Sequence, residues 1–103
     1  MHMHRSPYGN DPFAHQDELR KQFESNQVQF VLTELDTSAT FSDVAGSASD
    51  PVKIKRNVAN ARTAYETALK FANGASFDVT SKTEFDTKLE RAKLLLTALG
   101  EHF

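Results

Sequence analysis

The chain has 103 residues, of which 39% are hydrophobic and 25% charged, and its formal net charge is −2. This length and composition indicate one small globular domain, and the slightly acidic balance argues against nucleic acid as a partner. The sequence contains no cysteine, which excludes disulfides, thiolate metal sites and cysteine nucleophiles. Its uninterrupted apolar runs are far too short to cross a bilayer, so we expect no membrane partner and a cytoplasmic location.

The first residues show no apolar core of the kind that a signal peptide needs. We predict that residues 1–10 are a disordered lead-in. Residues 11–103 are predicted to form a single helical domain, beginning where Asn10-Asp11 offers a capping side chain before Pro12.

The segment from about Phe13 to Ala45 contains no internal proline or glycine, and we interpret it as one long helix. At 100° per residue its apolar side chains fall on two opposite faces. One face holds Val28, Val31, Leu32, Leu35 and Ala39. The opposite face holds Leu19, Phe23, Phe30, Phe41 and Val44. A helix with two apolar faces is normally buried between two layers.

A second helix is predicted over 51–72, with Asp50 as its N-cap and Pro51 as its first residue. Gly74, after Asn73, is predicted to end it in a left-handed conformation. Its single apolar stripe contains Ile54, Val58, Ala61, Tyr65, Ala68, Leu69 and Ala72.

A third helix is predicted to start at a capping box formed by Ser81 and Glu84, and to stop at Gly100. Its apolar face contains Phe85, Leu89, Ala92, Leu96 and Leu99, with Leu95 beside it. Leu94 does not fit this pattern, because it projects from the polar side.

These segments predict an all-α fold, an antiparallel three-helix bundle with a long first helix. The first helix would be about 50 Å long and the others about 30 Å, so its N-terminal part overhangs. Two arrangements could cover its second apolar face. The helix is continuous and a second molecule covers the face, or it breaks near Ser25-Asn26 and Phe13–Glu24 folds back as a fourth helix.

We therefore predict a protein that works by protein–protein interaction and self-associates as a homodimer through its first helix. The predicted interface residues are Leu19, Phe23, Phe30, Phe41 and Val44. The alternative is a helical adaptor that accepts the amphipathic helix of a partner protein in a groove between its helices.

No pattern indicates catalysis, and we expect neither an enzyme nor a cofactor. His15 and Glu18 are spaced to share one helix face, but no second such pair completes a four-ligand metal site. A local basic patch marks the start of the second helix, and the acidic residues of the first helix are expected to complement it. The patch consists of Lys53, Lys55, Arg56 and Arg62.

Two short stretches resemble known helical families. The segment Ala61-Arg-Thr-Ala-Tyr-Glu-Thr-Ala-Leu69 is similar to the second helix of a tetratricopeptide repeat, although the first-helix signature of that repeat is missing. The order of three helices, with Lys88-Leu-Glu-Arg-Ala-Lys-Leu94 in the third, resembles microtubule-interacting and transport domains. The second resemblance implies a three-helix module that binds partner helices in a groove. Neither resemblance implies particular binding residues.

Overall fold

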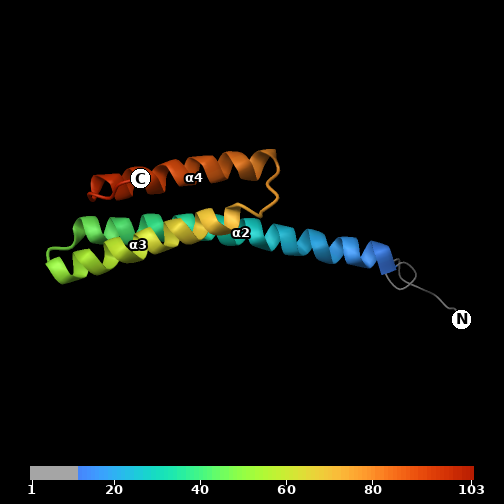
Figure 1. The fold of residues 1–103 in the computed structure, drawn as a ribbon, viewed down its shortest axis with the longest axis horizontal. Coiled ribbons are helices and arrows are strands. Elements are labelled where there is room, and N and C mark those ends of the chain that lie inside the picture. Colours follow the sequence, from blue (N-terminus) through green and yellow to red (C-terminus); the bar gives the residue numbers. More distant parts are fainter. Residues whose placement is uncertain (1–11) are drawn as a thin grey trace, which may run out of the picture.

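The computed structural model describes residues 12–103, and within them the chain forms three antiparallel helices and no strand (Figure 1). Helix α2 spans Pro12–Ser47, α3 spans Pro51–Ala72 and α4 spans Val79–Ala98. The all-α bundle with a long first helix is therefore confirmed. The predicted lead-in at 1–10 and the cap at Asn10-Asp11 lie outside the described residues.

Helix α2 is continuous through Ser25-Asn26, so the predicted alternative of a break with a fold-back fourth helix is wrong. Its 36 residues correspond to about 54 Å, against about 33 Å for α3 and 30 Å for α4. Val28 is buried directly after the weak helix formers, and the Gln27 side chain is hydrogen-bonded to α3. These tertiary contacts stabilise the helical conformation at a point where the low helix propensity of Ser25 and Asn26 would allow a break.

Helix α3 starts as the sequence predicted, because the carboxylate of Asp50 accepts a hydrogen bond from the backbone N–H of Val52 at 3.0 Å. Its C-terminus differs from the prediction. Asn73 is the C-cap in a right-handed helical conformation, and Gly74 does not adopt a positive φ. A glycine was therefore not required at this turn by backbone geometry.

Helix α4 begins earlier than predicted. Asp78 is its N-cap, and a reciprocal capping box joins the Asp78 side chain to the Ser81 backbone and the Ser81 hydroxyl to the Asp78 backbone. The predicted box between Ser81 and Glu84 is thus wrong by one turn, because aspartate accepts this hydrogen bond as readily as serine. The helix ends as predicted near Gly100, whose φ of 96° is left-handed.

The core lies along the first apolar face of α2, which is buried between α3 and α4. All five residues predicted for that face are buried. The central cluster contains Val28, Val31, Leu32, Leu35, Ala61, Tyr65, Ala68, Phe85, Ala92 and Leu96. Small residues bring α2 close to α3, and there the buried Ser38 hydroxyl donates a 2.8 Å hydrogen bond to the carbonyl of Ala61.

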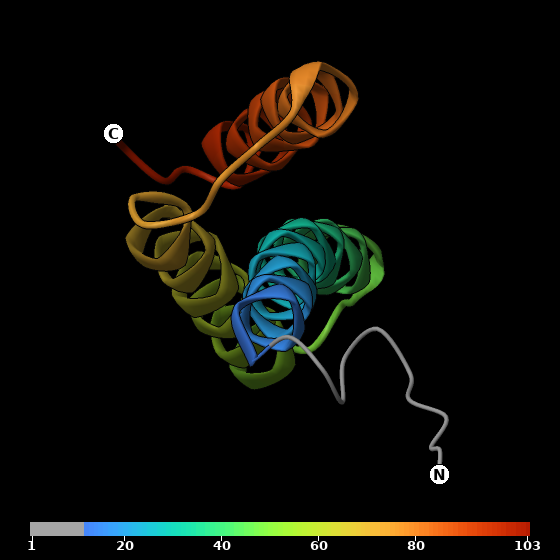
Figure 2. The ribbon, with the colours of Figure 1, turned by 90° about the vertical axis from the view of Figure 1, so that its right-hand side faces the viewer.

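Helices α3 and α4 both flank α2 and contact each other much less than either contacts α2, as the end-on view shows (Figure 2). The last turn of α3 lies beside residue 27 of α2, because the side-chain amide of Gln27 donates a 3.3 Å hydrogen bond to the carbonyl of Phe71. The N-terminal part of α2 projects past the last turn of α3 (Figure 1). We call residues 15–26 of α2 the arm, and residues 28–45 the clasped segment.

Candidate protein-protein interface

The arm is amphipathic in the opposite sense to the clasped segment. Its apolar residues Leu19 and Phe23 lie on the side of α2 opposite the core face, about half a turn away. Charged residues occupy the direction that becomes the core face further along the helix. They are Asp17, Arg20, Lys21 and Glu24. The core face is therefore confined to the clasped segment, whereas the second apolar face begins in the arm and continues past it at Phe30, Phe41 and Val44.

An apolar groove lies where the arm meets the bundle. It has a volume of about 390 Å³, and its walls are almost entirely apolar. Four of its lining residues come from α2 at positions 23, 26, 27 and 30, and the fifth is Phe71 from the last turn of α3. This spacing of i, i+3, i+4 and i+7 is the four-residue hole that receives a side chain in knobs-into-holes packing of helices.

Contacts between α2 and α3 shape the floor of this groove. The rings of Phe30 and Phe71 meet edge to face, with centroids 5.1 Å apart and planes at 78°. This geometry is favourable for aromatic pairs. Together with the hydrogen bond from Gln27 to the Phe71 carbonyl, it fixes the end of α3 against α2. The groove is thus preformed in a single chain.

The structure separates the five predicted interface residues into two groups. Leu19, Phe23 and Phe30 are 51%, 67% and 42% exposed and lie together on the arm and at its base. Phe41 is half-buried and packs against the core. Val44 is 37% exposed, but it lies about 37 Å from Leu19 along the helix axis. A single surface therefore unites only the first three.

Phe71 is the groove residue that the sequence pattern missed. It is 42% exposed and lies off the apolar stripe of α3. A bulky aromatic outside the buried stripe, next to the Asn-Gly end of a helix, was the available signal. Its pairing with Phe30 depends on how far α3 runs back along α2, and the sequence alone does not give that distance.

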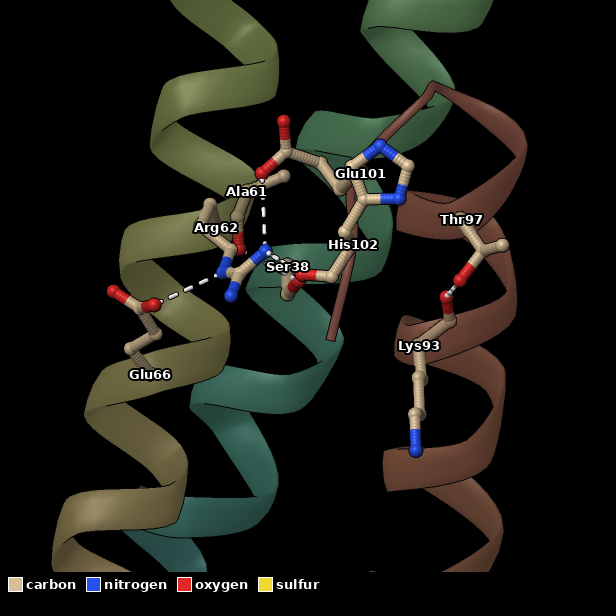
Figure 3. A network of polar contacts seen from close by, with 8 residues as sticks. All are labelled: Ser38, Ala61, Arg62, Glu66, Lys93, Thr97, Glu101 and His102. Atoms are coloured by element: carbon tan, nitrogen blue, oxygen red, sulfur yellow. Dashed lines mark hydrogen bonds and ion pairs between the residues drawn. The ribbon is translucent and has the colours of Figure 1, made fainter.

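A polar cluster lies toward the opposite end of the bundle from the groove (Figure 3). The Arg62 guanidinium donates to Glu66 at 2.9 Å, to Glu101 at 3.2 Å and to the carbonyl of His102 at 2.9 Å. It also lies 4.4 Å from the ring centroid of Phe103. Residues 101–103 thereby connect the end of α4 to α3.

The charge of Arg62 is central to this cluster. The pKa of Arg62 is raised, chiefly by the hydrogen bond to Glu66, so its charge is held. Burial raises the pKa of the Tyr65 hydroxyl, which therefore stays protonated at neutral pH. Because Arg62 is engaged in these contacts, it does not act as a free cation of the predicted basic patch.

The acidic residues of α2 pair with α4 and not, as expected, with the basic start of α3. Asp36 forms an ion pair with Lys88, with 2.7 Å between the carboxylate oxygen and Nζ. The carboxylate of Asp43 lies 3.7 Å from the guanidinium of Arg91. Both pairs are partly or largely exposed, so each contributes little to stability. They align α4 along the clasped segment of α2.

Within residues 12–103, no group of three or more histidine, aspartate or glutamate side chains is arranged to hold a metal ion. None of the helices in this part of the chain is long and apolar enough to cross a membrane. Comparisons with protein-family models, with curated proteins and with solved structures find no match for the chain. The resemblances to tetratricopeptide repeats and to microtubule-interacting and transport domains therefore stay predictions.

Proposed function

We propose that this protein works by protein–protein association and forms a homodimer through the groove and the arm. The observation that supports the proposal most strongly is the preformed apolar groove beside an exposed apolar arm face. Contiguous exposed apolar surface of this kind typically marks an interaction site in a soluble protein. The cytoplasmic location stays a prediction.

The size of the patch suits a dimer. Taking about 200 Å² for each large side chain, the exposed fractions of Leu19, Phe23, Phe30 and Phe71 correspond to about 400 Å² of apolar surface. Interfaces are about 60% apolar, so the matching footprint is roughly 670 Å² per chain. Two such footprints total roughly 1,300 Å², which is within the range of specific complexes.

The chemistry of the rim favours a second copy over a partner of opposite charge. Asn26 and Gln27 line the groove, and the exposed Gln22 lies beside it. Two identical surfaces with amide rims can meet without burying like charges, which would cost several kcal/mol. A foreign amphipathic helix could enter the same hole, as the adaptor alternative holds, but would find no charged groups in its lining to select it.

Phe23→Asp tests the proposal, and Leu94→Asp is the matched control. Phe23 is 67% exposed and Leu94, on the outer face of α4, is 61% exposed, so neither change buries a charge in the single chain. We expect the wild type and Leu94→Asp to show twice the chain mass by light scattering at about 100 µM. Phe23→Asp should show the mass of one chain with unchanged helix content by circular dichroism.

A wild-type protein that stays monomeric at this concentration contradicts the homodimer. In that case, binding of a synthetic amphipathic helix to the wild type but not to Phe23→Asp would support the adaptor alternative. A dimer that both aspartate variants leave intact would place the interface elsewhere on the molecule.

A further inference from the structure

We propose that two copies of α2 pair antiparallel about a two-fold axis between residues 23 and 26, so that Phe23 of each chain enters the groove of the other. This inference rests on the self-association proposed above. It specifies which way the partner helix runs and which side chain fills the groove, neither of which follows from self-association alone.

The shape of the groove identifies the group that fills it. A hole made by four residues at i, i+3, i+4 and i+7 accepts one large side chain from a facing helix. Phe23 is the most exposed of the apolar residues around the groove. It also lines the groove itself, so a two-fold arrangement lets each copy provide the hole and the knob at once.

The spacing of the apolar residues is symmetric about the proposed axis. Leu19 lies about five residues before the midpoint of 23 and 26, and Phe30 lies about five residues after it. In an antiparallel pair Leu19 of one chain therefore faces Phe30 of the other, and Phe23 faces the partner's groove around Asn26. Leu19, Phe23 and Phe30 are then all covered.

The same arrangement gives the projecting arm a place to lie. Residues 15–22 of one chain run beside residues 27–34 of the other, where Phe71 lines one side of the groove. Antiparallel helix dipoles also attract each other weakly. A parallel pair would instead bring the two arms together beyond both bundles.

Distances between spin labels on the two chains distinguish these arrangements. The chain has no cysteine, so Gln22→Cys and Thr40→Cys each introduce one labelling site. Both positions are exposed and lie on the same flank of α2, at equal angles from the apolar face. In the antiparallel pair, the axial separation of the two labels is about 8 Å at position 22 and about 46 Å at position 40.

We expect a short interchain distance at position 22, with the label pair at position 40 further apart by several tens of ångströms. Adding Phe23→Asp should abolish both interchain signals, and adding Leu94→Asp should leave them. Similar distances at the two sites in a dimer would overturn the antiparallel arrangement and leave self-association standing. A monomeric mass with no interchain signal in any labelled chain would overturn both proposals.

Discussion

The two halves of α2 show how one helix can serve two surroundings. In the clasped segment, Val31, Leu35 and Ala39 are buried, and Ser38 joins the helix to α3. In the arm, the same direction is charged, and the apolar side chains Leu19 and Phe23 turn to the opposite side. The core-facing apolar stripe thus begins near residue 28, where the bundle begins.

A helix with two apolar faces therefore need not be buried along its whole length. A single turn around Phe30 belongs to both regions, because Phe30 contacts Phe71 of α3 and also lines the groove. Where the core-facing stripe ends, the helix passes from a buried apolar surface to an exposed one.

The largest contrast should come from removing one leucine from each half. Leu35→Ala leaves a cavity in a fully packed site, and we expect a loss of about 3 kcal/mol in the free energy of unfolding. Leu19→Ala should change it by no more than about 0.5 kcal/mol, because the side chain is half exposed. Urea denaturation at a concentration where the chain is monomeric measures both, and equal losses would contradict the division of α2.

A finer contrast lies within the clasped segment. The Ser38 hydroxyl donates to Ala61, so Ser38→Ala should cost about 1 kcal/mol. The Ser42 hydroxyl, one turn later, is buried and has no hydrogen-bond partner among the described residues. Ser42→Ala should therefore be neutral or stabilising by up to about 1 kcal/mol, since it removes an unsatisfied polar group. Urea denaturation of the two variants gives the comparison, and a larger loss for Ser42→Ala would reverse it.

The smallest effect should appear at the start of α4 as the pH falls. Hydrogen bonds from the Ser81 backbone and hydroxyl lower the pKa of Asp78 below its ordinary value of 3.8. A lowered pKa in the folded state adds stability above the ordinary value, and this stability is lost as the pH falls through the folded value. Thermal melting should show a slightly weaker decline below about pH 4 for Asp78→Asn than for the wild type. Identical declines would show that the Asp78 charge is not involved.

Much of the fold could be predicted from local patterns. The core face of α2, the Asp50 cap and the stop at Gly100 follow from periodicity and from the conformations that single residues allow. The start of α4 was misplaced because both Asp78 and Ser81 can cap a helix, and Ser81 serves as the N3 partner of Asp78 in a local capping box.

The candidate site was less accessible to prediction. The sequence identified Leu19, Phe23 and Phe30, because they repeat on one helix face. It missed Phe71, whose place beside Phe30 depends on the axial position of α3 along α2. It also placed Val44 in one interface with Leu19 and Phe23, since an angular pattern does not show which part of a helix its neighbours cover.

The continuity of α2 has a consequence for the dynamics of the arm. A helix of about 12 residues is marginally stable in water by itself, so the arm owes its order to the clasped segment that continues its hydrogen-bond ladder. Fraying from the N-terminal end therefore costs little until it reaches Val28, where core burial begins. Pairing with a second chain would stop this fraying, and the helix content of the arm would then rise with protein concentration.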